Sequence, residues 1–508
     1  MSPRPKSLPQ DFDTVGWKGL MNAVSGATAQ EGLLLDADNV EMVLGDLRRA
    51  RKLKNFSATT LAGLPLAIIP YQLANGTYKL VIPTSEKVYG YTSAAVGFVE
   101  IGTYTGAASR NAFWSLFGGS LLFTDGVNPV QTYDGTTLAA LGGLTDVIAK
   151  SLATFWSFVF LFHTTESSVA CPHRVRWSNV GDSTAWASGL ADFVDLLDSY
   201  GEVQTGLPLG NKLLVYKDRA IYSGSYIGLP QVFDWNLLTA KIGILAPNTL
   251  AEFGGMHFFL GHDNVYVYNG FGDPTPIGEP IIEEILGPRR TSAAQYMNRA
   301  FGFYVTWLRE YWLMIPGGTG EYPVKLFRFH TPSQTWWPRH ESSGWVAAGE
   351  WLSADPVTWN DIAVADTWND FGVSETWNEL GGVAQNLFTP LIGVPSGVGS
   401  IIQELDETEP TTSEAYYVSK DYLFPIATRI LEYRIEAKGA LGQLTAYYST
   451  NEGDNWTSLG TKTLSGDEWQ WSTWTLNLVT NVIRFKVVLE AADVSLRKRS
   501  IVGIEKRR

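Results

Sequence analysis

Short apolar segments separated by Gly-rich turns recur along most of the chain. Residues 121–135 show the pattern clearly: an apolar strand, a turn containing Asp125-Gly126, a second strand ending in Val-Gln-Thr-Tyr, and a closing turn at Asp134-Gly135. Two short strands joined by such a turn are typical of a β-hairpin. We therefore interpret Asp125 and Asp134 as turn formers, because Asp side chains hydrogen-bond the backbone of tight turns.

The same hairpin pattern occurs seven times between residues 61 and 408. Before the last copy, the spacing of about 35 to 55 residues matches four-stranded propeller blades. A blade cannot bury both of its faces alone, so it must stack on neighbouring blades in a closed ring. The sequence predicts an all-β protein with a β-propeller of about seven blades, whose hairpins begin at Tyr78, Leu121, Phe158, Lys212, His257, Tyr311 and Leu387.

The flanking regions differ from the repeats. Residues 1–60 are predicted to form an N-terminal arm containing a hairpin that turns at Gly45-Asp46. Residues 409–508 mix apolar and charged positions, as in Arg429-Ile-Leu-Glu-Tyr-Arg-Ile-Glu. This pattern favours antiparallel strands with one exposed face, and the region is predicted to be a separate β-sandwich domain.

Dense basic residues occur at two places. Arg48, Arg49, Arg51 and Lys52 lie in the second strand of the predicted N-terminal hairpin, and Arg507 and Arg508 end the chain. The first run has two interpretations. It either protects a solvated strand edge from unwanted pairing or faces an acidic neighbour.

A shorter repeat interrupts the propeller at residues 353–386. Trp359, Trp368 and Trp377 each precede an Asn and an acidic residue and are spaced nine residues apart. Neither a continuous strand nor a helix places all three rings on one side at this spacing. We interpret the segment as stacked turns whose rings cluster against a blade. An aromatic ladder that binds sugar is the alternative.

Composition supports an all-β chain and limits its partners. The 508 residues include 19 Trp, 22 Tyr, 24 Phe and 50 Gly, which fits short strands joined by turns. No apolar run approaches the roughly 20 residues of a membrane helix, and no signal peptide is apparent. The single Cys171 predicts no internal disulfide. A net charge of −13 disfavours adhesion to nucleic acid, and it is also ordinary for solubility.

The sequence contains no recognisable catalytic, metal or cofactor motif. There is no phosphate-binding loop, no Gly-x-Ser-x-Gly and no His-Glu-x-x-His, and the six His residues are scattered. Asp192, Asp195 and Asp198 recur every third residue and would share a face of a helical turn, where they could hold a divalent cation. A solvated acidic loop is the alternative. No cofactor and no enzymatic activity are predicted.

A glycan-cleaving propeller is a rival interpretation. Residues 449–456, Ser-Thr-Asn-Glu-Gly-Asp-Asn-Trp, resemble the Asp-box turn of sialidases, with Asn451 and Asn455 where that motif prefers Asp and Thr. A glycosidase needs carboxylates that converge on a pocket. Asp125, Asp134 and Asp263 instead lie in or beside turn dipeptides. The motif therefore supports a hairpin and not glycoside cleavage.

The layout resembles the tail hub or nozzle proteins of short-tailed bacteriophages, also called packaged-DNA stabilisation proteins. The similarity lies in the opening arm (Trp17-Lys-Gly-Leu, Asp38-Asn-Val, Gly45-Asp-Leu-Arg-Arg), in Gly210-Asn-Lys-Leu-Leu-Val-Tyr-Lys-Asp-Arg-Ala-Ile-Tyr, in Asn264-Val-Tyr-Val-Tyr-Asn-Gly followed by Pro276-Ile-Gly-Glu-Pro-Ile, and in Ile501-Val-Gly-Ile-Glu. These are β-rich motifs spread over most of the chain.

The resemblance implies a structural protein of the virion tail, made in the host cytoplasm. It implies a homo-oligomeric ring of six copies below the portal and adaptor proteins, which retains packaged DNA, conducts it during ejection and carries a fibre, spike or needle. Double-stranded DNA would pass without sequence specificity. A negative lumen within about one Debye length, roughly 10 Å at 0.1 M salt, would repel the DNA backbone. A glycan-binding or sialidase-like propeller remains the alternative.

Overall fold

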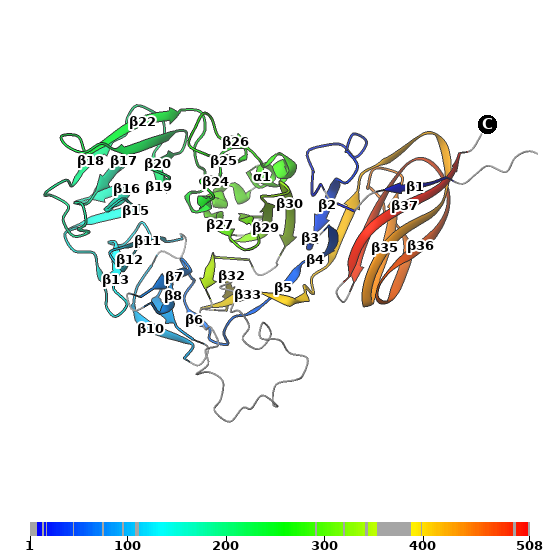
Figure 1. The fold of residues 1–508 in the computed structure, drawn as a ribbon, viewed down its shortest axis with the longest axis horizontal. Helices are drawn as coiled ribbons and strands as arrows, with labels where there is room; N and C mark the ends of the chain where they lie inside the picture. The colour runs from blue at the N-terminus through cyan, green and yellow to red at the C-terminus, as the bar shows by residue number, and fades with distance from the viewer. Residues whose placement is uncertain are drawn as a thin grey trace, which may run out of the picture.

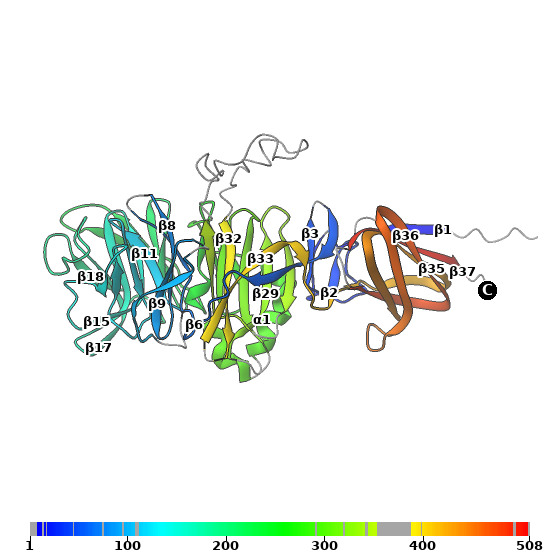
Figure 2. The same ribbon diagram turned by 90° about the horizontal axis from the view of Figure 1, so that it is seen from below.

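The computed structural model shows a seven-bladed β-propeller beside a C-terminal β domain (Figure 1). The all-β propeller predicted from the hairpin repeat is therefore confirmed. Figure 2, turned by 90°, shows the propeller as a disc with the C-terminal domain at one end. The structure describes residues 8–12, 15–16, 18–43, 45–73, 76–93, 96–106, 111–289, 292–317, 321–340, 344–352, 388–397, 399–490 and 494–505.

Six blades each consist of four consecutive antiparallel strands, with the first strand innermost. Each predicted hairpin supplies the middle strands of its blade. The strands are β7 (Ile69–Gln72), β8 (Tyr78–Pro83), β9 (Lys87–Tyr91) and β10 (Phe98–Thr103); β11 (Phe113–Phe117), β12 (Ser120–Thr124), β13 (Gln131–Tyr133) and β14 (Leu138–Ala140); β15 (Val147–Phe155), β16 (Phe158–Glu166), β17 (Val169–Trp177) and β18 (Asp192–Asp195); β19 (Val203–Leu209), β20 (Lys212–Lys217), β21 (Ile221–Tyr226) and β22 (Phe233–Thr239); β23 (Ala251–Phe253), β24 (Met256–Leu260), β25 (Val265–Tyr268) and β26 (Thr275–Pro276); and β27 (Phe301–Val305), β28 (Glu310–Pro316), β29 (Pro323–His330) and β30 (Thr335–His340).

The seventh blade closes the ring with strands from both ends of the propeller. Its inner strands are β31 (Ala347–Leu352), β32 (Phe388–Ser396) and β33 (Gly399–Pro410), and β5 (Arg51–Asn55) is the outermost. Gln403 lies opposite Asn55 and Asp406 opposite Lys52, while β6 (Leu61–Ala62) pairs with the start of β33. The predicted arm thus contributes a strand that joins the first and last blades.

Alternate residues of one strand bury against different neighbouring blades. Leu121 and Phe123 of β12 belong to the cluster shared with the first blade, whereas Leu122 belongs to the cluster shared with the third. Successive side chains on a strand point to opposite faces. A strand buried on both faces therefore reads as a continuous apolar run, which explains Leu121-Leu122-Phe123.

The other N-terminal strands join the C-terminal domain. A single eight-stranded sheet contains β1 (Leu8–Phe12), β2 (Leu34–Asp38), β3 (Val40–Val43), β4 (Asp46–Arg49), β34 (Ala415–Ser419), β35 (Tyr422–Ser449), β36 (Thr457–Glu490) and β37 (Ser495–Glu505). The hairpin predicted at Gly45 is β3–β4. Residues 1–60 are therefore divided between the two domains, because their strands pair with partners hundreds of residues away.

The C-terminal domain forms two layers through bending of its longest strands. In its first half β35 pairs with β37 and the middle of β36, as at Tyr433 opposite Trp474 and Ile501. In its second half β35 lies between the two ends of β36, so that Thr445 is opposite both Thr461 and Val488. Tyr433 of the first layer stacks on Phe485 of the second, with ring centroids 3.9 Å apart. The predicted sandwich is thus formed in part, by one continuous sheet.

The two domains share one hydrophobic core. Phe258 and Leu313 of the fifth and sixth blades, Leu34 and Val40 of the N-terminal strands, and Tyr433 of the C-terminal domain lie in a single buried cluster. The described helices are η1 (Pro247–Thr249), η2 (Glu279–Ile281), α1 (Ile282–Arg289) and η3 (Ser292–Arg299). Among the described residues, no helix is long and apolar enough to cross a membrane.

Candidate functional site

Five exposed apolar side chains lie in loops of the third and fourth blades. These two blades are at the end of the propeller opposite the C-terminal domain (Figures 1 and 2). We call this surface the apolar patch. Trp156 is 67% exposed and Leu229 is 76% exposed. The patch consists of Trp156, Val180, Tyr226, Ile227 and Leu229.

Neighbouring loops hold the apolar patch together. The rings of Trp156 and Tyr226 lie 6.2 Å apart, and Ile227 and Leu229 follow Tyr226 in the β21–β22 loop. The amide of Gly181 donates a hydrogen bond to the Ser157 carbonyl at 2.7 Å, which places Val180 beside the Trp156 turn. The turns after the first and third strands of each blade emerge on one face of the disc. The patch therefore occupies one face.

Trp156 adopts a backbone conformation that bulky residues avoid. It occupies the first position of the two-residue turn between the paired Phe155 and Phe158, with φ of 53°. Gly, Asn or Asp normally fill such a position, since positive φ is sterically costly for large side chains. Strain of this kind costs about 1–3 kcal/mol and is concentrated at functional sites. An exposed Trp gains no core packing that would offset the cost.

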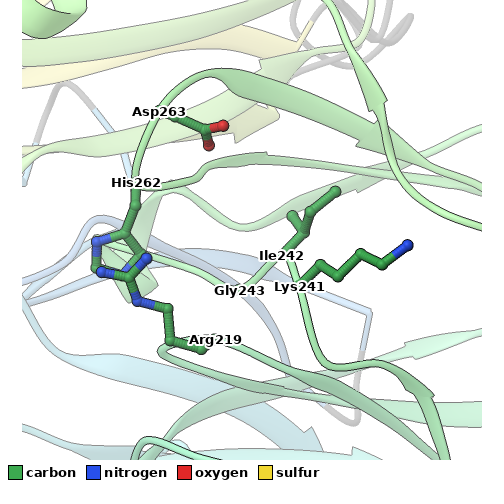
Figure 3. Close-up of a pocket in the computed structure, with 6 residues that line it drawn as sticks. All are labelled: Arg219, Lys241, Ile242, Gly243, His262 and Asp263. Atoms are coloured by element: carbon green, nitrogen blue, oxygen red, sulfur yellow. The ribbon is translucent and has the colours of Figure 1, made fainter.

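A small polar pocket lies on the other face of the disc, between the fourth and fifth blades. Its volume is about 230 Å³, and Figure 3 shows Arg219 and His262 on one side and Lys241 on the other. The full lining is Arg219, Lys241, Ile242, Gly243, His262 and Asp263.

Two equivalent turns of adjacent blades form the pocket. Arg219 lies in the turn between β20 and β21, and His262 and Asp263 lie in the turn between β24 and β25. Lys241 and Gly243 belong to the connection that passes between the turns. Gly243 packs so tightly that an added Cβ would lie 2.3 Å from the carbonyl oxygen of Lys217. The side chains around the pocket are thus presented by closely packed backbone.

Several charged groups in and beside the pocket have partners within the chain. Asp218 accepts from the Glu202 amide at 2.7 Å and from Gln204 Nε2 at 2.6 Å, so its carboxylate is engaged beside the turn. Asp263 accepts from the Tyr266 hydroxyl at 2.9 Å. Lys241 lies 3.6 Å from Asp273 in an exposed ion pair. Within the described parts of the chain, Arg219 has no ion pair or side-chain hydrogen bond.

His257 is a structural residue of the same blade interface. Its ring nitrogens lie 2.9 Å from the Tyr216 hydroxyl and 3.0 Å from the Pro208 carbonyl oxygen. Burial lowers the pKa of His257 to about 4, so the ring is neutral at physiological pH. Across the residues that the structure describes, no group of three His, Cys, Asp or Glu side chains could hold a metal ion.

The N-terminal basic run meets acidic and polar groups of its own chain. Arg48 Nε lies 3.1 Å from Glu41, and Arg49 donates to the Ser413 carbonyl at 2.8 Å. Lys52 lies 3.7 Å from Asp406, and the Arg51 carbonyl accepts from Arg339. Arg51 and Lys52 lie on β5, the edge strand of the seventh blade, as the strand-edge interpretation requires. The acidic residues that face Arg48 and Lys52 belong to β3 and β33 of the same chain. Trp359, Trp368, Trp377, Arg507 and Arg508 lie outside the described residues.

The acidic triplet is not on a helical turn. Asp192 and Asp195 begin and end strand β18, where an odd spacing points their side chains to opposite faces. Asp195 accepts two hydrogen bonds from Arg174, at 2.9 and 2.8 Å. Asp192 and Asp195 therefore do not share a face, and the cation hypothesis, which requires a shared face, is wrong for these two residues.

The turn-forming role of Asp125 and Asp134 is confirmed. Asp125 Oδ1 accepts from the amides of Val127 and Asn128 at 3.0 and 2.9 Å. Asp134 Oδ1 accepts from the amides of Thr137 and Thr136 at 2.7 and 2.8 Å, and these bonds lower the pKa of Asp134 to about 2. Both carboxylates are thus committed to backbone groups.

Neither the apolar patch nor the pocket was predicted from the sequence. Both combine residues from two blades, and no local motif marks such a juxtaposition. One signal was available for the patch: Phe155-Trp-Ser-Phe158 places a Trp where a two-residue hairpin turn favours Gly, Asn or Asp.

Comparisons with known proteins give only distant likenesses. No family model and no curated protein matches the chain. The WD40 domain of Neurospora crassa Pan2 is 7% identical, covers 69% of this chain and 92% of its own, and has a TM-score of 0.38. BamB from Moraxella catarrhalis is 8% identical over 73% and 94% of the two chains, with a TM-score of 0.35. The C-terminal CBM6 of the Zobellia galactanivorans laminarinase LamC is 12% identical over 22% and 87%, with a TM-score of 0.16. These scores are low, so the propeller assignment rests on the strand pairing.

Proposed function

We propose that the protein is a structural subunit of the tail hub or nozzle of a short-tailed bacteriophage. In this proposal six copies form a ring in the virion tail, below the portal and adaptor, that retains packaged DNA and conducts it during ejection. The apolar patch is the observation that carries the proposal. The six-membered ring itself is inferred from the resemblance of the sequence motifs to this family.

The apolar patch has the size and composition of the centre of a protein interface. With two aromatic and three aliphatic side chains, we estimate its exposed apolar area at roughly 500 Å², the upper range for patches on a monomer. Aromatic residues are enriched at the centres of protein interfaces, and charged residues are depleted there. Full burial of a large apolar side chain contributes about 1.5–3 kcal/mol. The patch therefore favours contact with a neighbouring subunit.

The position of the patch leaves the rest of the molecule available for other partners. The C-terminal domain lies at the opposite end of the propeller (Figure 2). A subunit that contacts its neighbour through the third and fourth blades can present the C-terminal domain to a portal, adaptor, fibre, spike or needle protein. The net charge of −13 suits a channel through which DNA slides without binding.

Mass photometry and electron microscopy of the purified protein test this proposal. We expect rings that form with rising protein concentration, and Trp156→Gly or Leu229→Asp should reduce the ring fraction at least tenfold. Tyr200→Ser is the matched control, because Tyr200 is 84% exposed but follows β18, on the other face of the disc. It should leave assembly unchanged.

Trp156→Gly also distinguishes a contact residue from a structural one. Glycine adopts positive φ without strain, so this variant should keep or raise the stability of the monomer, by about 1 kcal/mol, while ring formation falls. Monomers at every concentration of the wild-type protein, or rings that the patch variants leave intact, would overturn the proposal.

A further inference from the structure

We propose that the pocket between the fourth and fifth blades binds a small acidic sugar, meaning a hydroxylated ring that carries a carboxylate. The lining combines one free guanidinium, one ammonium, one imidazole, one carboxylate and one apolar wall. This site does not depend on ring assembly, because it lies on the face of the disc opposite the apolar patch.

Arg219 is the residue that recognises the anionic group. A guanidinium presents paired N–H donors whose planar geometry matches a carboxylate. Elsewhere in the chain Arg174 makes this bidentate contact with Asp195. Arg219 is exposed at the pocket and, among the described residues, has no carboxylate partner. A ligand carboxylate would complete the contact that Arg219 lacks.

The backbone fixes the origin of the Arg219 side chain. The Lys217 amide donates to the Ala220 carbonyl at 2.8 Å, which closes the turn that carries Arg219. The Ile244 amide donates to the Lys217 carbonyl at 3.0 Å and ties the same turn to the connection containing Gly243. Little backbone ordering is therefore required when a ligand binds, and a preorganised site loses less affinity to ordering.

Asp263 and Ile242 give the pocket its preference for a sugar over a simple anion. Asp263 accepts one hydrogen bond, from Tyr266, and a carboxylate has capacity for several more from ligand hydroxyls. A bare phosphate ion would meet this negative charge with no hydroxylated ring to bridge it. Ile242 offers an apolar surface to the C–H face of a ring. A ligand with an acid at one end and hydroxyls at the other satisfies both groups.

The cavity size sets the scale of the ligand. Pockets for drug-sized molecules are about 300–1,000 Å³. The volume here, about 230 Å³, is smaller and suits a single monosaccharide unit. Lys241 lies at the edge of the pocket, and its ion pair with Asp273 is solvent-exposed. Its ammonium group attracts an anionic ligand, and salt weakens this attraction.

Calorimetric titration with glucuronate, glucose and inorganic phosphate tests the proposal on the full-length protein. We expect glucuronate to bind more tightly than either of the other probes. Arg219→Gln should weaken glucuronate binding about tenfold or more, since it removes a charge-assisted contact. Asp263→Asn should weaken glucuronate binding while Lys462→Gln, an exposed charge change in the C-terminal domain, should have no effect.

Thermal unfolding of each variant confirms that it is folded before titration. Arg219 and Lys462 are exposed, so their substitution leaves the core intact. No measurable glucuronate binding, equal binding by phosphate, or glucuronate binding that Arg219→Gln leaves unchanged would each overturn the proposal. None of these results bears on ring formation, which the patch variants test separately.

Discussion

Removal of Arg328 should weaken the attachment of the N-terminal strands to the propeller. Arg328 of β29 is 3% exposed and donates to Glu41 of β3 at 2.7 Å and to the Val40 carbonyl at 3.3 Å. Glu310 of β28 is buried nearby, and its carboxylate accepts from Trp312 Nε1 at 2.7 Å. Arg328→Met therefore leaves two carboxylates without their shared cation.

The expected loss of stability is about 3 kcal/mol. Removing one partner of a buried ion pair costs about 3–5 kcal/mol, because the other charge stays buried. The lower end applies, since Glu41 keeps Arg48 at 3.1 Å and Glu310 can take up a proton. With about 2.1 cal/mol/K of unfolding entropy per residue, this corresponds to a fall in Tm of roughly 3–4 °C for a cooperative unit of roughly 350–500 residues. Differential scanning calorimetry measures it, with Lys87→Met, which breaks an exposed pair with Glu100, as the control.

The effect of Arg328→Met should depend on pH in a defined direction. Burial raises the pKa of Glu310 above 4.5, and Arg328 opposes that rise. Without Arg328 the pKa rises further. When the pKa of a carboxyl group is higher in the folded than in the unfolded state, the free energy of unfolding of the protein decreases as pH rises between those two pKa values. The difference in free energy of unfolding between the wild type and Arg328→Met should therefore shrink as pH falls toward 4.5. A loss of stability that is independent of pH, or no larger than that caused by Lys87→Met, would refute this reasoning.

Three further substitutions test the packing and the protonation of the fold. Gly143→Ala should destabilise the propeller severely in calorimetry, because Gly143 has φ of 74° and an added Cβ would lie 1.7 Å from the Thr184 carbonyl oxygen; an unchanged Tm would contradict the described packing. Phe485→Ala should cost about 3–5 kcal/mol and raise amide exchange in β35 and β36, with blades two to four unaffected as the internal control. Burial raises the pKa of Glu350 to about 7, so wild-type stability should fall as pH rises from 4.5 to 7. Glu350→Gln should remove this pH dependence of the Tm in thermal scans across the same range. A pH dependence that the substitution leaves unchanged would contradict the raised pKa of Glu350.

The repeat of apolar hairpins predicted the propeller because each blade is built from adjacent strands. The middle strands of all seven blades come from segments that read as hairpins, including β12 and β13 around Asp125. Closure by β5 could not be predicted, since Asn55 meets Gln403 through a pairing that no local pattern encodes. The helical turn that a cation site at Asp192 and Asp195 would require is not formed, because this segment pairs as a strand with β17. The apolar patch and the pocket arise where loops of two blades meet, which only the assembled ring defines.

Closure of the ring by β5 has a consequence for biosynthesis. Asn55 and Gln403 are 348 residues apart, so at about 5–20 residues per second the N-terminal strand waits roughly 20–70 seconds for its partner to be translated. Strand β1 waits longer, because β37 ends at Glu505. During that interval β5 and the open blades present unpaired edges that can join other nascent chains. A polysome carrying this message would hold many such edges in close proximity, which favours pairing between nascent chains before the ring closes.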